Sequence, residues 1–244
     1  AIVFIAIAII GLYVYFRARQ TNALLITQLD KNNLQQAENK LNIAANQHAA
    51  TLTVFFYFLN NSILSLRLTS QDFISHERSF ESGAYWDAGK LLTQNDQGSW
   101  DNPNTEAGSV FVPAASIISD TMKSELNTLK QIDFIAPSIL ETNPDVIAVY
   151  FGGVSGYTLY YPNIDLASIV PADFDVTGRP WFLKASAEQN PERAAVWSEP
   201  YLDAALNGIV ITNSAPVYDA AGRLRGVVAQ DIQLHRITAI VTSI

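Results

Sequence analysis

The chain has 244 residues, of which 23 are acidic and 15 are Lys or Arg, so its formal net charge at pH 7 is −8, and it contains no cysteine. The acidic balance argues against nucleic acid as the main partner, because binding to phosphates needs clustered Lys and Arg. The absence of cysteine from the sequence excludes disulfides, thiolate catalysis and cysteine-ligated metals.

The sequence opens with an uncharged apolar run, AIVFIAIAIIGLYVYF, and Arg17 and Arg19 follow it closely. A helix needs about 20 apolar residues to span a bilayer. The run has sixteen residues and begins without Met, so we expect residues 1–16 to be a truncated transmembrane helix. The aromatic cluster from Tyr13 to Phe16 is typical of a membrane interface. A secretory signal and a buried core helix are the alternatives, but no small-residue cleavage site follows and a polar helix continues directly.

Residues 17–69 are predicted to form a long stalk helix, because Pro and Gly are absent from 21 to 69 and helix-forming residues dominate. Apolar positions recur at steps of three or four, which predicts a single stripe. The stripe comprises Leu34, Ala37, Leu41, Ala44, His48, Leu52, Phe55, Leu59, Ile63 and Leu66. It would extend about 50 Å as a helix, too long for one compact lobe. We expect its lower part to make a stalk or dimer contact and its upper part to be core.

Residues 70–143 are predicted to be a loop insertion followed by a second helix. Gly, Asn, Asp and Ser accumulate between Ser70 and Pro113, which favours a partly self-packed surface excursion. Trp86 and Trp100 are expected to pin this excursion to the body. Helical spacing of apolar residues follows over 116–140, and Pro137 is expected to break the last turn.

Residues 144–232 are the β-rich part of the chain. Five strands are expected, over residues 146–151, 157–161, 194–198, 209–218 and 223–232. The glycines of residues 152–156 fit a hairpin turn better than a phosphate loop, because neither a helix nor a lysine follows them. The pattern predicts an α+β fold, with a long N-terminal helix followed by an antiparallel sheet flanked by helices. Residues 233–244 would begin a further helix.

One cation and two carboxylates in this region suggest a pocket for a small zwitterion. Arg179 can clamp a carboxylate with two hydrogen bonds, while Asp203 and Asp231 can receive an ammonium. Trp181 and Tyr201 would wall the apolar part of such a pocket.

Several of these residues also have a purely structural interpretation. Arg179 can pair with a carboxylate of the fold, Trp181 can be core, and Asp203 can cap a turn toward Asn207. Asp231 is harder to explain in this way, because a half-buried carboxylate needs a partner. The sequence does not tell which tyrosines face the pocket among Tyr150, Tyr157, Tyr160 and Tyr161.

The order of these motifs resembles a known family. Arg-Pro-Trp-Phe at 179–182, Pro-Tyr-Leu-Asp at 200–203 and Gly-Val-Val-Ala-Gln-Asp-Ile at 226–232 resemble the double Cache (PAS-like) extracytoplasmic sensor domains. Such domains belong to bacterial chemoreceptors, sensor histidine kinases, cyclic-dinucleotide enzymes and phosphatases. The resemblance implies that residues 144–232 form a membrane-distal PAS-like lobe. It also implies that residues 233–244 lead into a second, membrane-proximal lobe.

Members of this family that bind amino acids share a pattern of site residues. The corresponding positions here are Phe174, Arg179, Trp181, Phe182, Tyr201, Asp203 and Asp231. The resemblance implies that Arg179 and Trp181 hold the ligand's carboxylate, and that Tyr201, Asp203 and Asp231 hold its ammonium. Phe174 and Phe182 depart from the pattern, which has Tyr there. Each missing hydroxyl removes a possible polar contact worth about 1 kcal/mol or more when buried.

The resemblance implies a sensor domain of a bacterial transmembrane receptor that binds an amine-bearing ligand, most simply an amino acid, and signals through helices. Its partners would be this ligand, the membrane and a second copy of the chain, with the sensor lobe in the periplasm or outside the cell. No hydrolase, metalloprotease or nucleotide-binding motif occurs, so no catalytic residue, metal or cofactor is expected in this chain. The alternatives are a ligand-free dimerisation module and a membrane-anchored solute-binding protein.

Overall fold

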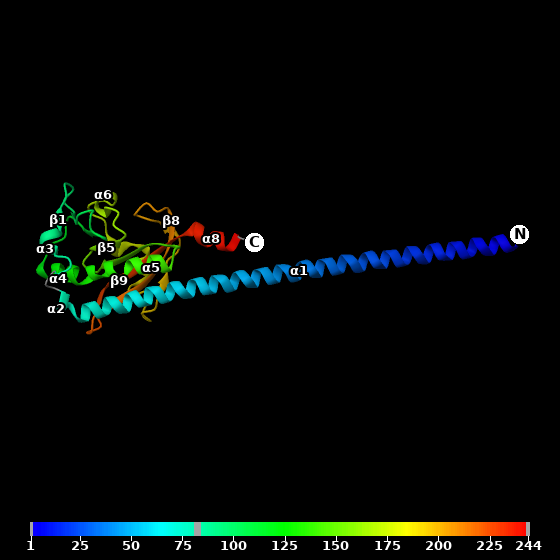
Figure 1. Cartoon of the computed structure of the whole chain (residues 1–244), viewed down its shortest axis with the longest axis horizontal. Coiled ribbons are helices and arrows are strands. Elements are labelled where there is room, and N and C mark those ends of the chain that lie inside the picture. The colour runs from blue at the N-terminus through cyan, green and yellow to red at the C-terminus, as the bar shows by residue number, and fades with distance from the viewer. Residues whose placement is uncertain (1, 81–83, 243–244) are drawn as a thin grey trace. The chain divides into compact units, whose positions relative to one another are not determined.

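The computed structural model describes residues 2–80 and 84–242, and it separates into two units, one up to Thr53 and one from Val54 onward (Figure 1). Helix α1 (Ile2–Ser75) begins in the first unit and ends in the second. It covers both helices expected for residues 1–69 and continues six residues beyond them. Of the helices in the described residues, α1 is long and apolar enough to cross a membrane.

The two ends of the predicted apolar stripe differ in burial. Leu34 and Leu41, in the first unit, are exposed, whereas Leu59, Ile63 and Leu66, in the second unit, are at most 1% exposed. The upper part of the stripe is therefore core, as its richness in Phe and Leu predicts. Burying three large aliphatic side chains contributes roughly 1.5–3 kcal/mol each, which fixes this end of α1 to the body.

The segment predicted as a loop insertion contains more regular structure than expected. It forms helices α2 (Glu77–Phe80) and α3 (Ala88–Leu91) and strands β1 (Thr93–Gln94), β2 (Trp100–Asp101) and β3 (Ser109–Val112). All four residues of β3 are buried. The prediction was wrong here because the three strands have only two to four residues each and lie among turn-forming residues. Trp86 is 1% exposed and belongs to the core.

The single helix expected over 116–140 is instead three consecutive elements: α4 (Asp120–Leu129), the 3-10 helix η1 (Lys130–Phe134) and α5 (Ala136–Thr142). Ser119 caps α4 by accepting a hydrogen bond from the Met122 N–H. Pro137 lies in the first turn of α5 rather than in a last turn. Proline is tolerated there because the first N–H groups of a helix have no intrahelical partner.

The remaining strands are β4 (Val146–Gly153), β5 (Thr158–Tyr161), β6 (Val196–Trp197), β7 (Tyr201–Leu202), β8 (Ile209–Tyr218) and β9 (Leu224–Gln233). Together with β1, β2 and β3 they form an antiparallel sheet in the order β1-β2-β3-β5-β4-β9-β8-β6, and β7 also pairs with β8. Between and after them come α6 (Leu166–Ile169), η2 (Val176–Gly178), α7 (Pro180–Ala185) and α8 (Leu234–Thr242). This arrangement confirms the predicted α+β fold.

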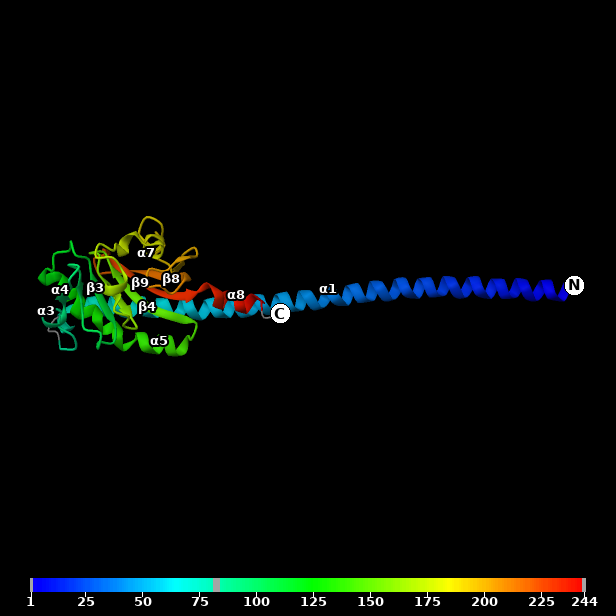
Figure 2. The same cartoon turned by 90° about the horizontal axis from the view of Figure 1, so that it is seen from above.

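The two faces of the sheet bury different cores. One core holds the upper end of α1 together with side chains of α4 and α5, and the other holds side chains of α6, η2 and α7. Figure 2 shows α7 and α5 on opposite sides of the strands. Because side chains alternate along a strand, Asp231 and Gln230 of β9 lie on opposite faces, and so do Thr212 and Asn213 of β8.

Candidate ligand-binding site

A small cavity of about 30 Å³ lies on the α7 face of the sheet. Its lining residues come from strands β4, β5, β7 and β9, from α6, η2 and α7, and from the turn after β7. They are Tyr150, Thr158, Tyr160, Leu166, Val170, Phe174, Val176, Arg179, Trp181, Tyr201, Asp203, Ala204, Ala205 and Asp231. Six of the seven predicted site residues are in this set; Phe182 is not.

Asp231 is the charged centre of this cavity. Its side chain is 1% exposed, and Oδ1 accepts hydrogen bonds from the Tyr150 hydroxyl (2.6 Å) and from Thr212 Oγ1 (2.5 Å). The Tyr201 hydroxyl lies 2.7 Å from Thr212 Oγ1 and completes a chain of hydroxyls that ends on the carboxylate. The register explains the cluster, because Thr212 of β8 pairs directly with Asp231 of β9.

Burial disfavours the charged form of Asp231 and, with the nearby carboxylate of Asp203, raises its pKa to about 7. The hydrogen bonds from Thr212 and Tyr150 and the positive charge of Arg179 act in the opposite direction. Burial likewise raises the pKa of Tyr150 well above its usual value, so this residue stays a hydroxyl and donates to the carboxylate. A cation that entered the cavity would relieve the repulsion between the two acids.

Asp203 holds the turn after β7. One carboxylate oxygen, Oδ1, accepts from the Ala205 N–H (3.1 Å), and Oδ2 accepts from the Asn207 side-chain amide (2.7 Å). Asn207 also donates to the Tyr160 hydroxyl (3.2 Å) and accepts, at its carbonyl, a bond from Gln233 Nε2 (3.0 Å). The structural interpretation of Asp203 as a turn cap is therefore correct, although its side chain lines the cavity as well.

Arg179 lies at the N-terminus of α7 and is partly buried. Its guanidinium lies over the rings of Phe174 (5.7 Å) and Tyr201 (5.5 Å) and donates to the Leu202 carbonyl at 3.3 Å. Within the part of the chain that the structure describes, it forms no ion pair with a carboxylate. The guanidinium is held by two aromatic faces and one carbonyl, which leaves donors for a ligand.

Trp181 and Phe182 follow each other on α7 but differ in their surroundings. Trp181 packs edge-on against Tyr150 at 4.9 Å and lines the cavity. Phe182 is buried against Trp181 and the backbone of Gly152, so the cavity position implied for it is not observed. A Cβ at Gly152 would come within 2.7 Å of the Trp181 ring, so only glycine allows the indole to pack this closely.

The sequence did not identify several residues of the site. Tyr150 and Tyr160 stack at 5.4 Å on the cavity face, whereas Tyr157 is buried in the opposite core. The alternation of side chains along a strand predicts that Tyr157 and Tyr160 lie on opposite faces of the sheet. It does not tell which of these two faces borders the cavity. Thr212 was not predicted, because a single threonine within an apolar strand does not by itself indicate a binding site.

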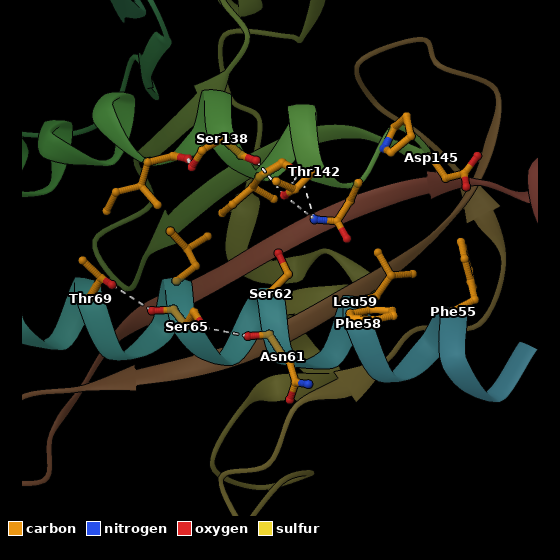
Figure 3. A pocket seen from close by; sticks show the side chains of 15 residues that line it. Phe55, Phe58, Leu59, Asn61, Ser62, Ser65, Thr69, Ser138, Thr142 and Asp145 are labelled. Atoms are coloured by element: carbon orange, nitrogen blue, oxygen red, sulfur yellow. Dashed lines mark hydrogen bonds between the residues drawn. The ribbon is translucent and has the colours of Figure 1, made fainter.

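A larger hollow of about 660 Å³ lies on the opposite face, between α1 and α5. Figure 3 shows Ser62 of α1 and Thr142 of α5 on its two walls. Its walls are mostly aliphatic, aromatic, hydroxyl and amide side chains. Asp145, its one charged lining residue, already pairs with Arg236 at 3.1 Å. Without an unpaired charge among its lining residues, this hollow offers less specific chemistry than the smaller cavity, despite its volume.

Comparison with known proteins identifies the family to which this fold belongs. The family of methyl-accepting chemotaxis protein-like, first PDC sensor domains matches residues 115–239, slightly more than half of the chain. The chain belongs to this family, which confirms the resemblance to extracytoplasmic sensor domains of chemoreceptors.

Individual relatives match a shorter part. The methyl-accepting chemotaxis protein TlpB of Bacillus subtilis (strain 168) is 39% identical over 95 residues, which are 39% of this chain and 13% of TlpB. McpC of the same organism is 32% identical over 103 residues, 42% of this chain and 14% of McpC. The chain thus spans about one seventh of the length of these relatives.

Solved structures of chemoreceptor ligand-binding domains also match. The domain of PctB from Pseudomonas aeruginosa PAO1, in complex with L-Gln, is 27% identical, with 44% of this chain and 42% of that chain covered and a TM-score of 0.36. The domain of Tlp3 from Campylobacter jejuni, in complex with 4-methylisoleucine, is 20% identical, with 80% and 63% covered and a TM-score of 0.39.

Proposed function

We propose that the unit from Val54 onward is the ligand-sensing part of a bacterial transmembrane receptor, and that its α7-face cavity binds a small amine-bearing ligand, an amino acid in the simplest case. The observation that carries this proposal is the meeting of one guanidinium and two carboxylates, those of Arg179, Asp203 and Asp231, around one cavity. A molecule that carries both a carboxylate and an ammonium complements this arrangement.

The two acids contribute differently. Asp203 is engaged by its own turn, whereas both hydrogen bonds to Asp231 go to Oδ1. Within the described residues Oδ2 of Asp231 accepts no hydrogen bond, so it is the stronger candidate acceptor for the ammonium. Arg179 would receive the carboxylate, and the rings of Trp181 and Tyr201 would cover the ligand's apolar atoms.

Ligand entry requires the cavity to expand. A volume of about 30 Å³ is far below the roughly 300–1,000 Å³ of typical ligand pockets, so the walls would separate when an amino acid binds. The turn at residues 203–208 would be the part that moves, because three of its residues line the cavity and breaking the side-chain bonds of Asp203 and Asn207 would free it. A ligand that binds the expanded form better than the closed form would shift the equilibrium between them, and β9 would carry the change into α8.

The remaining elements of the proposal concern the first unit. The apolar N-terminal part of α1 would anchor the receptor in the cell membrane, with the sensor unit in the periplasm or outside the cell. The exposed Leu34, Leu41 and Ile43 of α1 would pack against a second copy of the chain. A homodimer of this kind would pass the signal as a small displacement of helices.

Isothermal titration calorimetry with a panel of amino acids, amines and carboxylates tests the site. At least one zwitterion should bind, and Arg179→Ala and Asp231→Ala should each weaken its binding by tenfold or more, because each removes one partner of a buried charge. Lys184→Ala is the matched control, since Lys184 is exposed on the same helix as Arg179 and does not line the cavity. Binding by no zwitterion, or undiminished binding in both variants, would refute the site.

A further inference from the structure

The cavity contains one polar group that the acids and the arginine do not account for, the hydroxyl of Thr158. The Thr158 side chain lines the cavity and is 3% exposed, and Oγ1 has no hydrogen-bond partner among the residues that the structure describes. Leaving a buried hydroxyl unpaired costs about 1–3 kcal/mol, and such groups are uncommon in folded proteins. Thr158 is therefore a position where the fold alone does not use its polar atom.

The location of Thr158 distinguishes it from the other unpaired hydroxyls. It lies on the central strand β5, paired with Phe111 of β3 and Gly152 of β4. It shares the cavity face with Tyr160, two residues further along the same strand. Leu166, Val170 and Val176 line the same cavity. Thr128 and Ser70 also have unpaired hydroxyls, but they do not line the cavity.

The register separates Thr158 from Asp231 along the sheet. Asp231 pairs with Ala148 of β4 and Thr158 pairs with Gly152, four residues further along the same strand. Four residues of strand cover about 13 Å, and β5 and β9 lie on opposite sides of β4, about 10 Å apart across the sheet, so the two Cα atoms are about 16 Å apart. Two hydrogen bonds of about 2.9 Å leave about 10 Å for a ligand that contacts both residues. Lysine and arginine, whose long side chains end in a hydrogen-bonding group, come nearest to this length, whereas glutamine, alanine and valine are shorter.

We propose that Thr158 is a specificity-determining residue of the site, whose hydroxyl hydrogen-bonds a polar group at the far end of the ligand's side chain. This inference depends on the proposed function, since it assumes that the ligand's ammonium lies at Asp231. The aliphatic residues that line the same cavity would cover the stem of such a side chain. The preferred ligand then combines an α-amino acid head, an aliphatic stem and a terminal hydrogen-bonding group.

The test compares L-lysine with L-norleucine, which has the same four-carbon side chain without the terminal ammonium, by calorimetric titration of the wild-type chain, Thr158→Val and Thr158→Ser. Wild type should bind L-lysine more tightly than L-norleucine. Thr158→Val keeps the shape and removes the hydroxyl, so it should weaken L-lysine binding by roughly tenfold and leave L-norleucine binding unchanged. Thr158→Ser keeps the hydroxyl and should retain the preference.

Thr128→Val is the matched control, because it removes an equally buried and unpaired hydroxyl on α4, outside the cavity. Both Val variants should unfold at or above the wild-type temperature, and Thr128→Val should bind both amino acids as wild type does. An unchanged ratio of the two affinities in Thr158→Val overturns the role of Thr158. Binding of L-alanine but of neither longer probe to the wild-type chain would also overturn the role of Thr158, while the proposed function would stand. If no amino acid binds, the proposed function itself is refuted.

Discussion

Neighbouring residues of β8 and β9 bury their polar side chains differently on the two faces of the sheet. On the α1 face, Gln230 donates to the Leu59 carbonyl (2.8 Å) and accepts from Ser62 (3.2 Å), while Asn213 donates to Asn60 (2.9 Å). All of these groups are neutral and mutually satisfied. On the α7 face, the next residue of β9 is Asp231, a carboxylate whose charge is poorly compensated. The α1 face pairs these neutral groups with one another, whereas the α7 face retains a buried carboxylate next to a second acid.

The largest expected effect concerns this buried carboxylate. The pKa of Asp231 is about 7 in the folded chain and 3.8 without the fold, so between these values the folded state holds a proton that the unfolded state has lost. The contribution of Asp231 to stability is therefore full below about pH 4 and declines as pH rises to 7, by up to about 4 kcal/mol at about 1.36 kcal/mol per unit. Asp231→Asn cannot ionise and should not lose this stability.

Urea unfolding of the wild-type chain and Asp231→Asn at several pH values checks this expectation. The amide oxygen of Asn can still accept from Tyr150 and Thr212, so the variant should keep the local geometry. The difference in unfolding free energy between the two chains should change by several kcal/mol between pH 4 and pH 8, in favour of the variant at the higher pH. A constant difference would mean that Asp231 is compensated in the folded chain.

The next effect tests the packing of the upper part of α1 against the rest of its unit. Leu66→Ala should lower the unfolding free energy by about 3 kcal/mol, because Leu66 is fully buried and its removal leaves a cavity. Leu68→Ala is the control, since Leu68 lies on the same helix and is 58% exposed, and it should change stability by less than about 0.5 kcal/mol. Urea denaturation measures both. Equal losses in the two variants would contradict the assignment of α1 to the core.

A smaller effect tests the neutral amides of the α1 face. Gln230→Ala should cost about 2 kcal/mol, because it leaves the Leu59 carbonyl and the Ser62 hydroxyl without their partner inside the protein. Ligand affinity should fall little, since Gln230 does not line the cavity. A loss of affinity as large as that of Asp231→Ala, with the unfolding free energy unchanged, would show that the two faces are not separate in function.

The sequence was sufficient for the features that depend on local pattern. The stripe from Leu59 to Leu66 is buried as its spacing predicts, and strands β8 and β9 follow the apolar runs at 209–218 and 223–232 closely. Short strands were harder to predict from the sequence. Strand β3 has only four residues and its burial depends on β5, a partner about 50 residues away, so no local pattern marks it.

In the candidate site, too, some features could be predicted from the sequence and others depend on contacts between distant segments. The sequence predicted that Arg179, Trp181 and Asp231 lie around one pocket, and all three line the same cavity. The position of Phe182 depends on the missing side chain of Gly152, a contact between segments that spacing does not encode. The turn that lines the cavity is likewise held by side-chain bonds of Asp203 and Asn207, which form only once the chain has folded.

The bond from Gln233 to the Asn207 carbonyl has a consequence for signalling. Gln233 is the last residue of β9, and α8 begins at the next residue. The turn at residues 203–208 and the start of α8 are thus connected through one side-chain amide. A movement of this turn would either pull on the start of α8 or break the bond, so the first turn of α8 would be restrained differently in the two cases.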